Sequence, residues 1–233
     1  MSDLEQVKTK IESRGNWQTI IRPAKHVPDR VKNIIALEDI LRGARVSIRG
    51  WDFPHFDDRL RATTVAQDYI AQSVSWDAYH EVWRFHQSGQ FHDLAAFTED
   101  WRSPDGWVPA ERGWEPGKYL GIERTIYRMI ETFILAGRLA GTAAGDEKMY
   151  IRATLRGLAK RQLEPSPDMM PSIIPHVASV AEYRLEGEFD RGDLTNAPND
   201  YALEWSRELF RRFGWDAQMD VLKALAERFG RFR

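Results

Sequence analysis

Apolar and polar residues alternate along several short segments of the chain, which is the pattern of a β-strand with one buried face. Residues 16–23, 148–156 and 180–189 follow this pattern. Within residues 83–91 the alternation runs up to a Ser-Gly-Gln turn and resumes after it, which predicts a β-hairpin. In this interpretation the polar side of each strand faces solvent, as antiparallel sheets allow.

A different spacing, with apolar residues three and four positions apart, predicts helices elsewhere in the chain. The predicted helices cover residues 31–42, 118–141, 198–213 and 216–229. In the longest of them we expect an apolar stripe against the sheet and an opposite polar face that carries Glu123, Arg124, Arg128 and Glu131.

Together these elements predict a single α+β domain over residues 1–233, because strands and helices follow one another without a regular βαβ repeat. We expect a mainly antiparallel sheet of about six or seven strands, covered by the long central helix and the two C-terminal helices. Residues 1–14 are interpreted as a polar N-terminal arm or a short helix. Residues 162–176 contain four prolines and are interpreted as an irregular Pro-rich connection.

The composition narrows the classes of function. It is that of a globular protein, with 42% hydrophobic residues and a formal net charge of −2. The chain contains no cysteine, which excludes disulfides, thiol nucleophiles and cysteine-containing zinc sites. The N-terminus lacks the apolar core of a signal peptide, and no apolar run approaches the ~20 residues that cross a bilayer. We therefore expect a cytoplasmic protein with no membrane association and no cofactor.

The segment RGWDFPHFDDRL at residues 49–60 concentrates candidate chemistry. His55 and Asp52 are candidates for a general base and the carboxylate that orients it. The preceding residues 44–50 alternate like a strand, but the large apolar residues change parity after Gly50. We interpret the segment as a strand end that is bulged at Gly50 and followed by a loop from His55 onward.

Three histidines at positions 80, 86 and 92 suggest a metal site on the predicted hairpin, with Glu81 and Asp93 as further ligands. A metal requires three or four ligands that converge, and His80 lies far along the strand from the turn. The alternative interpretation is a set of surface or partly buried histidines. We adopt this alternative and expect no metal site.

Arginines on several predicted strands suggest nucleic-acid binding through a basic sheet face. The residues concerned are Arg45, Arg49, Arg59, Arg61, Arg84, Arg152 and Arg156. The alternative is that they pair with acidic residues of neighbouring strands, Glu182 and Glu186 among them. Trp107 and Trp114 lie in the Pro- and Gly-rich segment 102–117, where tryptophan either anchors a loop or offers a contact surface.

The segments RGWDFPH at 49–55, WRFHQSGQF at 83–91 and EDW at 99–101 resemble segments shared by a set of uncharacterised bacterial proteins. The resemblance implies a bacterial origin. It carries no activity and no functional residues across to this chain.

The leading hypothesis is a non-enzymatic binding, adaptor or sensor subunit of a bacterial multi-protein assembly, with a protein partner or a second copy of the chain. Two alternatives stand beside it: a nucleic-acid-binding protein that uses an arginine and aromatic sheet face, and a hydrolase or metal-dependent enzyme centred on His55. The candidate binding residues are Arg49, Trp51, Arg84, His86, Trp107 and Trp114. Convergence of Arg49, His55, Arg84 and His86 in one cleft would mark the functional site.

Overall fold

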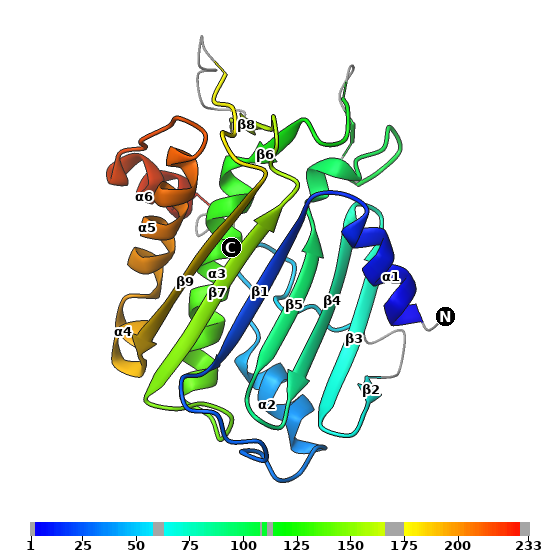
Figure 1. Ribbon diagram of the computed structural model, residues 1–233, viewed down its shortest axis with the longest axis vertical. Coiled ribbons are helices and arrows are strands. Elements are labelled where there is room, and N and C mark those ends of the chain that lie inside the picture. Colours follow the sequence, from blue (N-terminus) through cyan, green and yellow to red (C-terminus); the bar gives the residue numbers. More distant parts are fainter. Residues whose placement is uncertain (1–2, 58–62, 108, 111–113, 166–174, 229–233) are drawn as a thin grey trace.

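A seven-stranded antiparallel sheet forms the centre of the computed structural model, with its strands in the order β2-β3-β4-β5-β1-β7-β9 (Figure 1). The structure describes residues 3–57, 63–107, 109–110, 114–165 and 175–228. Along the chain the strands of this sheet are β1 (Asn16–Pro23), β2 (Thr64–Val65), β3 (Tyr69–Trp76), β4 (Tyr79–His86), β5 (Phe91–Ala96), β7 (Lys148–Arg156) and β9 (Glu182–Asp190). The sheet and its helices confirm the predicted α+β fold.

Strand β1 lies between β5 and β7 near the middle of the sheet, with Thr19 opposite Asp93 on one side and Ala153 on the other. Its alternating residues Trp17, Thr19 and Ile21 are buried on one sheet face. The predicted hairpin is β4 and β5, and Gly89 in its turn has a φ of 83°, which favours glycine.

Helix α3 (Ile122–Ala140) covers one face of the sheet, as Figure 1 shows. Its apolar residues are buried along its length, since they pack against the sheet and the neighbouring helices. The other helices on this side are α2 (Ala36–Ala44), α4 (Arg191–Asn196), α5 (Pro198–Arg211) and α6 (Met219–Glu227). Helix α1 (Asp3–Glu12) lies on the opposite face, where Val7 and Ile11 pack against Val82 and Leu94. The N-terminal segment is therefore a helix, one of the two alternatives that the sequence left open.

The predicted strand at residues 44–50 is wrong. The only ladder contact in this part of the chain joins Val46 to Phe53, whose backbone N–H and C=O groups exchange two hydrogen bonds of 2.8 Å. The chain therefore turns back on itself between these residues, through Gly50 with a φ of 78°. The change of parity after Gly50 in the sequence reflects this reversal rather than a bulge in a continuous strand.

The connection at residues 162–176 begins as a short strand, β8 (Gln162–Glu164), which pairs in parallel with β6 (Tyr119–Gly121). Residues 166–174 of the predicted Pro-rich connection lie outside the described residues. In the part of the chain that is described, none of the helices has the length and apolar character needed to cross a membrane.

Candidate functional site

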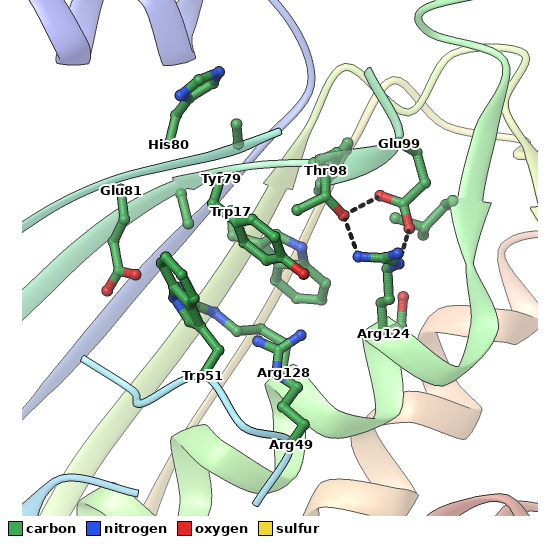
Figure 2. Close-up of a pocket in the computed structure, with 15 residues that line it drawn as sticks. Trp17, Arg49, Trp51, Tyr79, His80, Glu81, Thr98, Glu99, Arg124 and Arg128 are labelled. Carbon is green, nitrogen blue, oxygen red and sulfur yellow. Dashed lines mark hydrogen bonds and ion pairs between the residues drawn. The ribbon is translucent and has the colours of Figure 1, made fainter. Parts of the chain in front are cut away.

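A small cavity lies between the β4 and β5 strands, the N-terminal half of α3 and the segment of residues 46–57 (Figure 2). We call it the α3 cavity. Its volume is about 50 Å³, whereas a single water needs roughly 10–15 Å³ on the same kind of measure. It therefore has room for several waters or for the polar group of a small molecule. The side chains that matter chemically are Arg49, Trp51, Tyr79, Glu81, Thr125 and Arg128.

Glu81 and Asp93 form a pair of buried carboxyl groups beside the α3 cavity. In the β4–β5 ladder Ala95 lies opposite Glu81 and Trp83 opposite Asp93, so the two acids occupy diagonal positions on one sheet face. They are 5% and 0% exposed. Burial and then the neighbouring Asp93 raise the pKa of Glu81 well above its usual value, although Arg128 opposes the shift. Glu81 therefore keeps its proton at pH values at which an exposed glutamate has lost it.

Arg128 reaches this pair from α3 and donates a hydrogen bond from Nη2 to Asp93 Oδ2. Within the described part of the chain, Asp93 Oδ1 receives no hydrogen bond from a backbone group or an ionised side chain. A protonated Glu81 is a neighbouring donor for this carboxylate, because a hydrogen bond with Asp93 favours the protonated form of Glu81. One arginine and one proton thus hold two carboxyl groups together.

A second ion pair, between the partly buried Arg49 and the buried Glu131, holds the segment of residues 46–57 against α3. Arg49 donates from Nε and Nη2 to the two carboxylate oxygens of Glu131, both at 2.8 Å. Burial opposes the charge of Arg49, but the paired Glu131 outweighs it and raises the pKa of Arg49 above its usual value. This bidentate pair fixes the position of the neighbouring Trp51 at the cavity.

Two hydrogen-bond donors at the α3 cavity have no partner among the described residues. They are Nε of Arg128 and Oγ1 of Thr125, and the two side chains are 6% and 1% exposed. Both residues line the cavity and lie three positions apart on α3, so they share one face of the helix. An unpaired buried donor costs about 1–3 kcal/mol, so a group that accepts from both would be stabilised here.

Stacked aromatic rings border the cavity. The ring of Trp51 lies 3.9 Å from that of His55 and 4.6 Å from that of Tyr79, and both pairs are nearly parallel. Trp76 continues the stack at 6.0 Å from Trp51, and the highly exposed Trp107 lies 6.2 Å from Trp76. We call Trp51, His55, Tyr79 and Trp76 the aromatic wall.

The predicted catalytic pair of His55 and Asp52 is not brought together as an acid and base. Asp52 forms an ion pair with Arg45 at 3.0 Å, while the His55 ring stacks on Trp51. The backbone of His55 also makes two hydrogen bonds: its N–H donates to Glu81 Oε1 at 3.4 Å, and its C=O accepts from Trp83. His55 therefore positions the wall next to Glu81.

The six predicted binding residues are divided between two faces of the sheet. Arg49 and Trp51 lie at the α3 cavity, and Trp107 lies at the outer end of the aromatic wall. Trp114 donates from its indole N–H to the C=O of Glu99, so it anchors the backbone beside the cavity. Arg84 and His86 lie on the opposite face.

Arg84 and His86 share the parity of Val82, which packs under α1, and each has a carboxylate nearby. Arg84 is 3.6 Å from Glu5 of α1, and His86 is 3.3 Å from Asp68. Figure 2 shows the same alternation at the start of β4, where His80 and Glu81 leave the strand on opposite sides. Arg49, His55, Arg84 and His86 therefore do not converge in one cleft.

The three histidines are likewise spread over the face that α1 partly covers. His92 lies opposite Arg84, and six residues of strand, about 20 Å, separate His80 from His86. Burial and then Lys10 lower the pKa of His80 to about 4. No group of three or more metal-ligating side chains occurs in the described ranges.

Several of the arginines considered for nucleic-acid binding are paired with acids. Arg45 pairs with Asp52, Arg49 with Glu131, Arg84 with Glu5 and Arg156 with Glu182. Arg152 lies opposite Glu186 in the β7–β9 ladder. Arg59 and Arg61 lie outside the described residues.

Thr125 and Arg128 were not among the site residues predicted from the sequence. Arg128 and Glu131 were assigned to the helix face opposite the apolar stripe, yet in the structure they are buried, at 6% and 0% exposed. The signal that identifies them is on the strands: Glu81 and Asp93 have the parity of buried aromatic residues, so their charges require partners on the covering helix.

Comparisons with known proteins give no relative for this chain: no protein-family model matches it, and neither does a curated protein or a solved structure.

Proposed function

We propose that this protein is a non-enzymatic binding subunit of the sensor type, and that a small molecule binds in the α3 cavity. The observation that carries the proposal is the presence of two buried, unpartnered donors, Arg128 Nε and Thr125 Oγ1, on the cavity lining. Buried polar groups of native proteins are nearly always hydrogen bonded. A ligand with acceptor oxygens offers the kind of partner that both groups lack.

The way the cavity is built also supports binding. Its charged residues are held by buried partners, so Arg49 and Arg128 are fixed before a ligand arrives. Preorganised groups lose little conformational entropy on binding, which raises affinity. The aromatic wall adds a rigid apolar border beside these polar groups, and this combination is typical of small-molecule sites.

The two alternative functions receive less support from the geometry. The enzyme hypothesis assigned Asp52 as the carboxylate that orients His55, whereas Asp52 pairs with Arg45. A nucleic-acid surface needs arginines available to phosphates, whereas Arg84 and Arg156 each have a carboxylate within 4.0 Å. Association with a protein partner or with a second copy of the chain is a separate prediction. Sedimentation velocity of the purified protein tests self-association directly.

The proposal is tested by thermal shift and calorimetry with a panel of small carboxylates, phosphates and neutral amides. We expect at least one compound to raise the melting temperature of the wild-type protein. Replacement of Thr125 by valine removes one donor with little change of shape, so Thr125→Val weakens binding of that compound by about tenfold, equivalent to roughly 1.4 kcal/mol.

The matched control is Thr9→Val, since Thr9 is an exposed helical threonine on α1, at the opposite face of the sheet. This variant keeps the affinity of the wild type. Equal affinities in all three proteins would place the ligand elsewhere and remove the basis of the proposal. A panel with no binding compound would also count against it.

A further inference from the structure

The charges around the α3 cavity balance only if one carboxyl group is neutral. Arg49, Arg124 and Arg128 supply three positive charges, and their partners Glu131, Glu99 and Asp93 supply three negative charges. Glu81 is the seventh charged residue of this set, and no arginine is left over for it. The site is therefore neutral with a proton on Glu81 and carries a charge of −1 without it.

The unpaired groups decide which kind of ligand fits. An arginine Nε–H donates hydrogen bonds and never accepts them, so the unpaired Nε of Arg128 requires an acceptor as its partner. Carboxylate and phosphate oxygens accept hydrogen bonds from both kinds of donor, an arginine Nε–H and a threonine hydroxyl. The other hydrogen bond of Arg128 goes to Asp93, so a ligand oxygen on Nε extends an existing charge-assisted network.

We infer that the α3 cavity binds an oxyanion, and that it does so only while the Glu81–Asp93 pair holds a proton. The inference rests on the proposed function and names its ligand class and its control by pH. When the proton leaves, the pair carries two negative charges beside one guanidinium, and a third anion is repelled in a site with little water. Anion binding and proton binding at this pair therefore support each other.

Few other groups near the pair change charge close to neutral pH. The charged groups that face Glu81 are Asp93 from β5, Arg128 from α3, and Arg49 with its partner Glu131; Tyr79 lies on the same strand. Residue 74, opposite Glu81 on β3, is a valine. The imidazole of His55, on the loop next to Glu81, is a further ionisable group whose contribution must be separated by experiment.

The test measures dissociation constants by calorimetry from pH 5 to pH 8.5 for benzoate, acetate, inorganic phosphate and benzamide. Benzamide has the shape of benzoate without its charge, and phosphate distinguishes a tetrahedral oxyanion from a carboxylate. We expect an oxyanion to bind at least tenfold more tightly than benzamide. Its affinity should fall by up to about tenfold per pH unit once the pair loses its proton.

Two variants identify the residue whose protonation controls binding. Glu81→Gln keeps the size of the side chain and an N–H donor but cannot ionise, so it binds the oxyanion with an affinity that no longer depends on pH. His55→Gln keeps the pH dependence of the wild type. A separate readout on the wild type alone is the number of protons taken up on binding, from calorimetry in two buffers with different ionisation enthalpies.

The outcomes separate this inference from the proposed function. If benzamide binds as well as benzoate and Thr125→Val weakens both, the binding function stands and the oxyanion inference fails. A pH dependence that survives in Glu81→Gln and disappears in His55→Gln also overturns the inference. If none of the four probes binds, this inference fails, and the wider panel of compounds decides the proposed function.

Discussion

Two buried arginine and aspartate pairs in this protein differ in how completely they are hydrogen bonded. Arg161 uses Nη1 and Nη2 on the two oxygens of Asp100, at 2.7 and 2.5 Å, and donates further to the carbonyl groups of Tyr119 and Gly157. Asp100 also accepts from two backbone N–H groups. Arg128, by contrast, retains one atom, Nε, without a partner in the described structure.

The difference separates a structural ion pair from one that is suited to binding. The Arg161–Asp100 pair ties together the ends of β1, β6 and the loop after β7, and each nitrogen of the Arg161 guanidinium donates at least one hydrogen bond. The Arg128–Asp93 pair lies beside a cavity and has a neutral acid next to it. A buried donor that lacks a partner and belongs to a residue lining a cavity is a position where an acceptor group of a ligand is stabilised.

The largest expected effect on stability comes from breaking the Arg161–Asp100 pair. Arg161→Met leaves the carboxylate of Asp100 buried without its guanidinium, so we expect the free energy of unfolding to fall by about 3–5 kcal/mol. Urea denaturation followed by tryptophan fluorescence measures it. Arg156→Met is the control, because the Arg156–Glu182 pair is solvent exposed and its loss costs about 0–1 kcal/mol. Equal losses in the two variants would contradict the structural role of the buried pair.

A smaller effect is expected from Arg128→Met. A proton on Asp93 can replace the lost positive charge, since Glu81 and Asp93 already lie together in a buried site. We expect the free energy of unfolding to fall by about 1–3 kcal/mol near pH 5. The fall is larger near pH 8, where protonating both Glu81 and Asp93 costs more free energy. Denaturation curves at the two pH values test this. A loss that does not depend on pH would show that the pair behaves like Arg161 and Asp100.

The smallest effect, and one of opposite sign, is expected from Glu81→Gln. The pKa of Glu81 is raised in the folded state, so the unfolded chain ionises first as pH rises above about 4.5. The stability of the wild type therefore falls from that pH up to the folded pKa, by about 1.4 kcal/mol for each unit by which the pKa is raised. Glutamine does not titrate, so the variant lacks this fall and is more stable than the wild type near pH 7.

The pH profile of unfolding between pH 4 and pH 8 is the measurement for this variant. Glu188→Gln serves as the control, because Glu188 lies on the edge strand β9 and is exposed. It keeps the wild-type profile. A Glu81→Gln profile that is parallel to the wild-type one would mean that Glu81 is ionised like a surface carboxylate and that the comparison of the two pairs is wrong.

The periodicity of the chain was enough to predict most of the scaffold. Strict alternation identified β1, β7 and β9 because each has one buried and one more polar face, and helical spacing identified α3, α5 and α6. Alternation failed at residues 44–50 since a segment that folds back through Gly50 has the same local pattern as a strand. Periodicity reports local exposure and cannot distinguish a chain reversal from an extended run.

The candidate site was predicted only in part for a related reason. Arg49, Trp51 and His55 were identified from local composition, and they do lie at the α3 cavity or in its aromatic wall. Arg84 and His86 were grouped with them but point to the other sheet face. Thr125 and Arg128 are separated from Glu81 by more than forty positions, so their meeting depends on how α3 lies across the sheet.

The sequence by itself determined the α+β class, most of the strand and helix positions and the absence of cysteine chemistry, because each of these depends on residue type and short-range spacing. Only the tertiary structure decided which charges are buried and which remain without a partner. The pairing of a residue such as Arg128 depends on the charges and donors that other elements bring to it, and the local sequence carries no record of those neighbours.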